Sequence, residues 1–372
     1  MDASAQFKIF LVGLPGLESV LLDEARRLGF PEPVSVPGGV EFVGAWEDVW
    51  RANIAVRGAS RVLARVAEFR APHLAQLDKR SRKVEWGAFV PADASISVEA
   101  SSKRSRVYHT GAIRQRIEDA IRDSVGCTIK KEGADLVLRA RLDNDLCTIS
   151  IDTSGDPLHK RGFKQAVNKA PMRETMAAQF LMAAGYDGTE SVLDPMCGSG
   201  TFVIEAAEMA LGLLPGRERH FAFEQLASFD AEAFATLKRM DSKESELTFY
   251  GRDRDAGAIE MSQANAARAG VDALTHFEHS AISDLQVPTD AKPGLVIVNP
   301  PYGDRIGDKK KLQALYGSFG KVMRERFVGW RVAMITDDKQ QARATGLPFK
   351  APTSPIPHGG LKVKLYQTGV LR

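Results

Sequence analysis

The chain has 372 residues, 44% of them hydrophobic, which is enough for a large core and for two or three domains. No apolar run approaches the about eighteen residues of a membrane span and no basic-then-apolar leader opens the chain, so we expect a cytoplasmic protein. The net charge of +3 hides an uneven distribution, because residues 51–170 carry nine more basic than acidic side chains. That middle segment is the expected polyanion-facing part.

The first seventy residues alternate strand and helix patterns in the order βαββαβ. A hairpin signal, Pro37-Gly38-Gly39, lies between its two middle strands. This order predicts a ferredoxin-like domain over residues 1–70. The expected strands are Phe7–Gly13, Val34–Val36, Val40–Val43 and Arg61–Phe69, and the second helix is expected at Ala45–Asn53.

The next segment, residues 71–155, is basic. A helix is expected from Pro72 to near Trp86, then a strand at Ile96–Ala100, a second helix carrying Arg114, and two strands at Asp135–Ala140 and Leu146–Asp152. Its cations would contact the phosphates of a nucleic acid, although a merely solvated charged face is the alternative. The candidate RNA contacts are Lys79, Arg80, Lys103, Arg104, Arg106 and Arg114.

A basic linker, residues 153–169, follows. His159, Lys160, Arg161 and Lys164 are candidate RNA contacts there, and a solvated connection is the alternative. His159 is a weak candidate for a general base, because a lone histidine in a linker usually has no catalytic partner.

From Ser191 onward strand and helix patterns alternate, which predicts a doubly wound parallel sheet. A helix at Pro171–Ala184 precedes it, and Gly359–Val370 is expected to form a closing antiparallel pair. The aromatic-rich insertion Pro215–Glu246 interrupts the pattern after the first helix of the sheet. The strands are expected at 191–194, 247–252, 274–279, 294–298 and 330–336, with helices near 201–211, 256–269 and 313–327.

A glycine turn follows the first strand of this sheet. Gly198 and Gly200 allow close approach of the backbone to a ligand, and the amides of the next helix favour an anionic group. Asp253, at the end of the next strand, could accept hydrogen bonds from ribose hydroxyls. Alone, the turn could equally serve a dinucleotide, a phosphate or helix packing. The predicted cofactor contacts are Asp194, Pro195, Cys197, Gly198, Ser199, Gly200, Thr201, Asp253 and Arg254.

The apolar strand Leu295–Val298 ends in Asn299-Pro300-Pro301-Tyr302. The side-chain oxygen of Asn299 and the carbonyl of Pro300 could accept both N–H groups of an exocyclic amine, which localises its lone pair for attack on a methyl group. Pro301 stiffens the loop, and Tyr302 could stack on the base. An ordinary turn is the alternative. Cys197 has no paired base, so a nucleophilic role is disfavoured, and the cysteines Cys127, Cys147 and Cys197 lack metal-ligand spacing, so no metal is expected.

Asp194-Pro195-Met196-Cys197-Gly198-Ser199-Gly200-Thr201, the later Gly251-Arg252-Asp253 and Asn299-Pro300-Pro301-Tyr302 resemble motifs of class I S-adenosylmethionine-dependent methyltransferases acting on exocyclic amines. The whole chain resembles the RlmL-type guanine-N2 RNA methyltransferases that carry a THUMP domain. The resemblance implies an α/β fold with a Rossmann-like methyltransferase domain over residues 156–372, preceded by ferredoxin-like and THUMP domains over 1–70 and 71–155.

The resemblance also implies S-adenosylmethionine as cofactor and methylation of guanine N2, first of all in 23S (large-subunit) rRNA, with neither DNA nor membrane as partner. Asn299, Ala281 and Ile282 would join the cofactor contacts. The chain departs from the family where an acid usually holds the adenine amine, because Ser280 and Ala281 stand there and Asp284 is the nearest acid. The alternatives are a tRNA guanine-N2 methyltransferase, an adenine-N6 enzyme, and a non-catalytic RNA-binding ribosome assembly factor.

Overall fold

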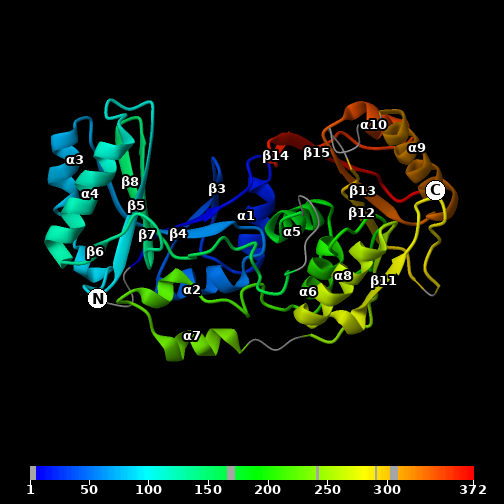
Figure 1. Cartoon of the computed structure of the whole chain (residues 1–372), viewed down its shortest axis with the longest axis horizontal. Coiled ribbons are helices and arrows are strands. Elements are labelled where there is room, and N and C mark those ends of the chain that lie inside the picture. Colours follow the sequence, from blue (N-terminus) through cyan, green and yellow to red (C-terminus); the bar gives the residue numbers. More distant parts are fainter. Residues whose placement is uncertain (1–5, 166–171, 240–242, 290, 302–308) are drawn as a thin grey trace. The chain divides into compact units, whose positions relative to one another are not determined.

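The structure, a computed structural model, describes residues 6–165, 172–239, 243–289, 291–301 and 309–372. The chain divides into two compact units, which the sequence colours of Figure 1 help to trace. Unit 1 consists of Met1–Gly13, Leu21–Leu158 and Arg219–Arg239, and unit 2 of Leu14–Val20, His159–Glu218 and Met240–Arg372.

Unit 1 is built on one eight-stranded sheet with the strand order β2-β3-β1-β4-β8-β7-β5-β6. Its ferredoxin-like part joins the rest through the antiparallel pairing of β4 with β8, which runs from Leu63 opposite Asp152 to Arg70 opposite Leu146. The strands are β1 (Phe7–Val12), β2 (Val34–Val36), β3 (Gly39–Gly44), β4 (Arg61–Arg70), β5 (Ser95–Lys103), β6 (Thr128–Ile129), β7 (Leu136–Asp143) and β8 (Leu146–Asp152).

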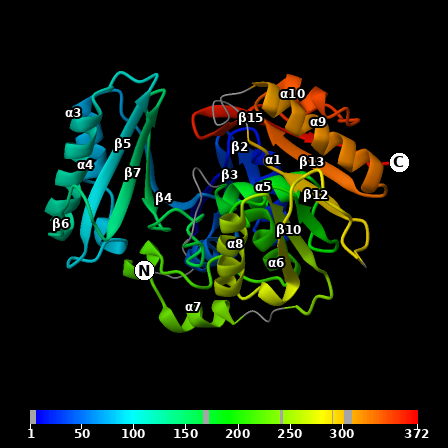
Figure 2. The same cartoon turned by 45° about the vertical axis from the view of Figure 1, so that its right-hand side comes forward.

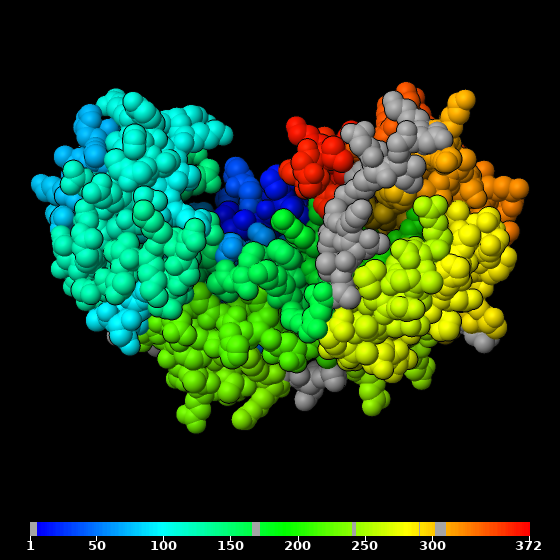
Figure 3. All heavy atoms as spheres, viewed as in Figure 1, coloured from blue at the N-terminus to red at the C-terminus, as the bar shows by residue number. Residues whose placement is uncertain are grey.

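The helices of unit 1 begin with α1 (Glu18–Arg27) and α2 (Trp46–Ala55) in the ferredoxin-like part. The two later ones, α3 (Leu74–Ser81) and α4 (Thr110–Val125), lie side by side in both cartoon views (Figures 1 and 2) and form an outer surface in light blue and turquoise (Figure 3). Buried Ile113, Ile117 and Ile121 recur every four residues along α4, which gives that helix one apolar stripe.

Strand β7 shows the two faces of the sheet. Leu138 and Leu142 are fully buried, whereas the alternate residues Arg139, Arg141 and Asp143 remain partly or fully exposed. Because successive side chains of a strand point to opposite faces, one face belongs to the core and the other is polar.

Three elements of this part of the structure differ from the prediction. The helix expected to reach Trp86 ends at Ser81, because the indole of buried Trp86 donates to the Ser81 carbonyl at 2.9 Å and the chain turns back there. Strand β5 extends beyond the predicted end at Ala100 to Lys103. Strand β6 was not predicted, since its two residues are too few to show a period.

Unit 2 is built on a seven-stranded sheet with the order β11-β10-β9-β12-β13-β15-β14. The first five strands of that order pair in parallel, and β15 pairs antiparallel to β13. The strands are β9 (Val192–Asp194), β10 (Phe249–Asp253), β11 (Thr275–His279), β12 (Leu295–Val298), β13 (Arg331–Thr336), β14 (Ile356–His358) and β15 (Leu361–Gln367). The predicted closing pair begins earlier than Gly359, because Gly359 and Gly360 have φ of +55° and +86° and form the turn itself.

Apolar clusters cover both faces of this sheet. One contains Phe180 and Phe202, and the other contains Tyr316 and Phe319. Helix α8 is fixed at both ends, by the Asp255 side chain that accepts from the Gly257 amide and by Gly270 with φ +71°. The helices are α5 (Glu174–Ala183), α6 (Thr201–Ala210), α8 (Ala256–Ala269), α9 (Lys309–Arg326) and α10 (Lys339–Ala344). Among the described residues, no helix is long and apolar enough to cross a membrane.

The aromatic part of the predicted insertion belongs to unit 1. Helix α7 (Ala231–Lys238) and the preceding 3-10 turn at Ala222–Gln225 lie in that unit. Phe223 contacts Phe229 and Trp50 of α2 with ring centroids 5.7 and 6.3 Å apart, and its amide donates to the Thr153 carbonyl. Such ring pairs each contribute about 0.5–1.5 kcal/mol beyond their buried area. These contacts are a reason why the segment folds with α2 although it interrupts the methyltransferase pattern in the sequence.

Candidate active site and nucleic-acid surface

Two loops follow the carboxyl ends of the neighbouring central strands of unit 2. Strands β9 and β12 pair in parallel, so the residues after Asp194 and those after Val298 leave the sheet at the same edge. Ligands of open α/β sheets bind at this edge, where the strand order reverses. The predicted glycine turn and the predicted Asn-Pro-Pro loop are therefore neighbours.

The glycine turn is held in shape by hydrogen bonds from helix α8. Ser262 donates to the Gly198 carbonyl at 2.8 Å, and Asn265 donates to the Ser199 carbonyl at 3.1 Å. Gly198 and Gly200 have φ of +54° and +81°, which L side chains rarely adopt. A Cβ at Gly200 would press on Ser262, but a Cβ at Gly198 would meet nothing within 4 Å. The space over Gly198 is thus open, as a ligand site requires.

Neither Ser262 nor Asn265 was among the predicted site residues. Their spacing of three places both on one face of α8, which is the signal that a reading of the sequence could have used. Gly251 in β10 was also overlooked, although a Cβ there would come 2.3 Å from the Phe277 ring and 3.1 Å from the Cys197 sulfur. Burial raises the pKa of the Cys197 thiol well above its ordinary value, so this side chain packs and is not a nucleophile.

Two carboxyl groups face the turn. Asp253 accepts from the amide of Gly198 at 2.9 Å and from that of Asp255 at 3.0 Å. Asp194 is fully buried and accepts from the Met196 amide at 3.0 Å. Burial first, and the Asp253 charge in addition, raise the pKa of Asp194 to about 8. The Asp194 carboxyl is therefore mostly protonated at neutral pH, and a cationic ligand beside it would favour loss of that proton.

The start of α6 receives a lysine. The Lys164 ammonium donates to the Thr201 hydroxyl at 2.9 Å and to the Met172 carbonyl at 2.6 Å, and it pairs with Glu174 at 3.4 Å. Burial lowers the pKa of Lys164 and raises that of Glu174. Lys164 was predicted to contact RNA, but its side chain is buried next to the predicted cofactor contact Thr201.

The Asn299 side chain has an unusual environment. Its Oδ1 is buried and has no hydrogen-bond partner among the residues that the structure describes. A buried acceptor without a partner costs about 1–3 kcal/mol, so such atoms call for an explanation. The loop beyond is anchored, because the Tyr316 hydroxyl of α9 donates to the Pro301 carbonyl at 3.3 Å. Pro300 is buried between them. The predicted stacking residue Tyr302 lies outside the described residues.

The loop after β11 was the uncertain part of the predicted site. Ser280 donates its amide to the Asp253 carbonyl at 2.9 Å, which brings the two strand ends together, and Ala281 and Ile282 are partly exposed. Arg254 is exposed and its carbonyl contacts His279. Asp284, the nearest acid, lines a separate pocket of about 460 Å³ with Tyr250 and Arg252. Pro195 is buried in the first loop.

The remaining linker cations are not a shared RNA surface either. Arg161 is buried and pairs with buried Glu205 at 3.2 Å, so it cannot reach a phosphate without breaking that pair. Burial first, and its cationic neighbours in addition, lower the pKa of His159 to about 4, which leaves it neutral at pH 7. Lys160 alone of these four is exposed. The sequence pattern could not separate buried from exposed cations.

The predicted contacts of unit 1 are exposed, and they lie on three elements. Lys79 and Arg80 are on α3, and Arg114 is on α4, where it pairs loosely with Glu118 at 3.7 Å. Of the other three, Lys103 ends β5, and Arg104 and Arg106 lie at the start of the connection from β5 to α4. This surface also exposes 79% of Tyr108, an aromatic that is not among the predicted RNA contacts.

The connection that carries Tyr108 is tied to the β7–β8 turn. Asp145 accepts from the Arg106 amide at 2.7 Å, and its own amide donates to the Ser105 hydroxyl at 3.0 Å. The Arg104 guanidinium donates to both carboxyl oxygens of Asp143, at 2.7 and 3.0 Å. The segment 103–109 is therefore pre-shaped, and its cations and its tyrosine are presented on a fixed backbone.

The fold and the two loops define a class I methyltransferase domain that follows a ferredoxin-like and a THUMP-like part. Family comparisons agree: an RlmL ferredoxin-like domain matches residues 8–63, a THUMP domain matches 72–152, and an RMKL-like methyltransferase domain matches 161–350. The chain belongs to the RMKL-like methyltransferase family. The predicted fold class is thereby confirmed, as is S-adenosylmethionine as the cofactor of this class of enzyme; the exact domain boundaries stay a prediction.

Among curated proteins, the chain is 36% identical to a ribosomal RNA large subunit methyltransferase K/L of Syntrophotalea carbinolica, over 93% of this chain and 51% of that one. It is 33% identical to the protein of that name in Vibrio cholerae, over 87% and 48%. The chain thus spans about half the length of the curated relatives it matches.

Solved structures of similar length also match. A possible methylase from Clostridium difficile superposes with a TM-score of 0.89 at 29% identity, covering 99% of both chains. A chain described as a predicted N6-adenine-specific DNA methylase from Listeria monocytogenes gives 0.88 at 29%, covering 98% and 97%. A third, a methyltransferase complexed with SAH, gives 0.89 at 27%, covering 99% of both chains.

Proposed function

We propose that this chain transfers a methyl group from S-adenosylmethionine to the N2 amine of a guanine in large-subunit ribosomal RNA, in the cytoplasm. The observation that carries the proposal is the buried Oδ1 of Asn299, an acceptor without a partner among the described residues, in the loop next to the open glycine turn. The relatives named ribosomal RNA large subunit methyltransferases support the choice of RNA.

The cofactor would lie at the glycine turn. The open space over Gly198 would let the cofactor approach the backbone of the turn closely. The amides at the start of α6 would suit the carboxylate of the cofactor. Asp253 keeps a lone pair on each carboxyl oxygen for ribose hydroxyls beside the two amides it already accepts. Asp194 would face the cationic part. The sulfonium supplies an already activated methyl group, so the protein needs no metal and no strong base.

The reacting base would be oriented by the second loop. Asn299 Oδ1 accepts one N–H of the exocyclic amine and the Pro300 carbonyl accepts the other, which localises the nitrogen lone pair toward the methyl group. After transfer the amine nitrogen loses one proton to solvent water. Two prolines and the Tyr316 contact to Pro301 restrict the backbone from Asn299 to Pro301, so the two acceptors need little reorganisation. Stacking on Tyr302 remains a prediction.

The base must leave a duplex or belong to an unpaired loop before it can reach these acceptors. The cations of unit 1 would hold the surrounding RNA through its phosphates, which is the sequence-independent share of affinity. In unit 2, Lys160 is the exposed one of the predicted linker contacts and would help. Arg161 and Lys164 would instead support the cofactor side by fixing the fold around α6.

The test is methyl transfer from labelled cofactor to undermodified large-subunit rRNA and, in parallel, to unmodified tRNA, with the product nucleoside identified by mass spectrometry. N2-methylguanosine in rRNA alone is the expected result. The same product in tRNA alone would move the enzyme to the tRNA branch, and N6-methyladenosine would overturn the base assignment. Binding of both RNAs without methylation of either would favour a non-catalytic assembly factor.

A further inference from the structure

The polar face of the unit 1 sheet is hollowed into a pocket of about 640 Å³. Strands β1, β4, β5, β7 and β8 all line it, so it lies across the junction of the ferredoxin-like part with the rest of the sheet. Pockets of about 300–1,000 Å³ take small ligands, a range that includes a single nucleotide. Four guanidinium groups line it: those of Arg61, Arg65, Arg139 and Arg141.

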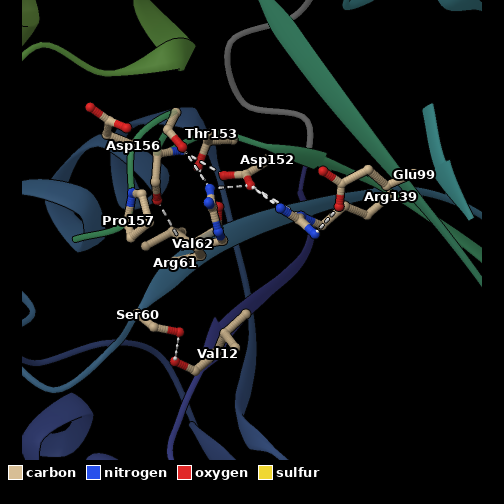
Figure 4. A network of polar contacts seen from close by, with 12 residues as sticks. Val12, Ser60, Arg61, Val62, Glu99, Arg139, Asp152, Thr153, Asp156 and Pro157 are labelled. Carbon is tan, nitrogen blue, oxygen red and sulfur yellow. Dashed lines mark hydrogen bonds and ion pairs between the residues drawn. The ribbon is translucent and has the colours of Figure 1, made fainter. Parts of the chain in front are cut away.

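Two of these arginines share one buried carboxylate. Asp152, whose side chain is 1% exposed, accepts from Arg61 at 2.5 Å and pairs with Arg139 at 3.0 Å (Figure 4). Arg61 also donates to the Gly155 carbonyl at 2.6 Å. One negative charge thus orients two positive ones, and the planar guanidinium groups are set before any ligand arrives.

The second partner of Arg139 is of a different kind. Glu99 pairs with it at 2.5 Å from the neighbouring strand, but the Glu99 side chain is 59% exposed (Figure 4). An exposed carboxylate can be replaced at the guanidinium by another anion at small cost, because exposed ion pairs are weak. Arg141, 58% exposed and paired with Asp143 at 3.1 Å, is similarly available.

The alternative is that these arginines have a purely structural role, as a row of cross-strand ion pairs that stabilises the sheet, since such pairs do so in many proteins. It accounts for Arg61, Asp152 and Arg139. It also covers Arg65, which pairs with Glu41 of β3. It does not account for the hollow itself, or for the position of the Arg65 guanidinium over the Phe10 ring, 4.7 Å from its centroid on the pocket wall. Arginine planes over aromatic rings are surfaces on which unpaired RNA bases stack.

The edge of the pocket adds cations. Asp143 lines the pocket, and Arg104 of the pre-shaped segment 103–109 is bound to it, so this segment borders the pocket. Lys103 and Arg106 extend the positive edge, with Arg106 70% exposed. A mixed lining with a cationic edge suits a base inside and phosphates at the edge, whereas a uniformly basic groove would suit a duplex backbone.

We propose that this pocket binds an unpaired nucleotide of the RNA, with its phosphate on Arg139 and Arg141 in place of the Glu99 carboxylate. The inference rests on the proposed function only in taking RNA as the substrate. We assign to this pocket of unit 1 a nucleotide other than the one to be methylated, which the Asn299 loop of unit 2 would hold. It would set which RNA the protein recognises.

The experiment is a fluorescence anisotropy titration of the full chain with a labelled RNA single strand of about ten nucleotides, and with the same sequence as a blunt duplex. The single strand should bind more tightly. Arg141→Ala should weaken it by about tenfold and reduce the slope of log affinity against log salt by about 0.7. Glu99→Gln should tighten binding several-fold, because it removes the carboxylate that competes with phosphate for Arg139, while the Asp152 pair continues to orient that guanidinium.

Glu99→Gln separates the two explanations, since loss of a purely structural ion pair would lower stability and leave RNA affinity unchanged or weaker. The matched control is Arg26→Ala, which removes an exposed arginine of α1 that pairs with Asp23 at 3.6 Å and does not line the pocket. It should leave binding unchanged. Thermal unfolding of each variant checks that the fold is intact.

Wild-type affinity in both pocket variants would overturn the proposal, and so would equal binding of duplex and single strand. These outcomes are independent of the methyl-transfer test. Pocket variants that bind the oligonucleotide normally while rRNA is methylated would refute the pocket and leave the function standing. An oligonucleotide affinity that depends on Arg141 in a protein that methylates no RNA would do the reverse.

Discussion

Lysines and arginines of two short basic segments have opposite environments in the two units: those of one are buried and those of the other are exposed. In unit 2, Arg161 and Lys164 are buried and paired with Glu205 and Glu174. In unit 1, Arg106 and its neighbours are exposed on a pinned segment. Residue type therefore does not decide whether a cation is accessible to a ligand such as RNA; burial does. Burial should also set the size of each effect, because buried charges lack solvent to replace a lost partner.

The largest effect is expected at the buried pair. Arg161→Met removes the guanidinium that pairs with the Glu205 carboxylate in a dry environment, and we expect the free energy of unfolding to fall by about 3–5 kcal/mol. Chemical denaturation monitored by circular dichroism measures it. The double variant Arg161→Met/Glu205→Leu should recover much of the loss, and a single variant as stable as the wild type would refute the buried pair.

Asn299→Ala comes next. We expect kcat to fall about 10²–10³-fold, because one preorganised acceptor of the reacting amine is removed. Cofactor affinity, measured by calorimetry, should stay within a factor of two or so of the wild type, since the side chain acts mainly on the base. Unchanged turnover would remove Asn299 from the mechanism, whereas loss of cofactor binding would assign it to the cofactor.

The pH dependence of cofactor binding tests the buried acid of the same unit. The pKa of Asp194 is about 8 in the free protein, so the carboxyl is mostly protonated at pH 7, and a cationic cofactor favours the ionised form. Affinity should therefore rise by up to about tenfold per pH unit between about pH 6 and 8 and then level off. Calorimetry in buffers of different ionisation enthalpy should detect proton release. A flat profile would contradict the assignment.

The smallest effect on stability and binding is expected at the exposed Arg106 of unit 1. Arg106→Met should leave stability unchanged and weaken RNA binding only a few-fold, with a salt slope lower by about 1 because one phosphate contact is lost. Anisotropy titrations over a salt series measure both quantities. A stability loss as large as that of Arg161→Met would break the comparison between the units.

Helices and strands could be predicted closely where a hydrophobic pattern continues over many residues. Helix α8, with its alanine run, its Asp255 cap and its terminal Gly270, was expected at 256–269 and lies at Ala256–Ala269. Strand β12 was equally visible as a fully apolar run. Short or interrupted elements were not. Strand β6 has two residues, and α3 ends at Ser81, whose carbonyl accepts from the Trp86 indole five residues further on, a contact that no hydrophobic period reveals.

The candidate site could be predicted where the type of a residue and its position in a turn or at a strand end together indicate a role. Glycines that need positive φ, as at Gly198 and Gly200, and an acid at a strand end, as at Asp253, are local signals. Ser262 and Asn265 lie more than sixty residues from the loop they hold, so only the tertiary structure connects them. The burial of Arg161 is likewise a property of its partner Glu205, forty-four residues away.

The segment Arg219–Arg239 leaves unit 2 after Glu218 and returns to it at Met240. Leu14–Val20 makes a similar excursion in the opposite direction, and its Leu17 is part of the core cluster that contains Phe180. A single cut of the chain therefore cannot yield two complete folding units. A fragment starting at residue 156 would expose Phe223 without Trp50, and it would lack Leu17. Cutting the chain at that point should consequently give aggregation-prone pieces.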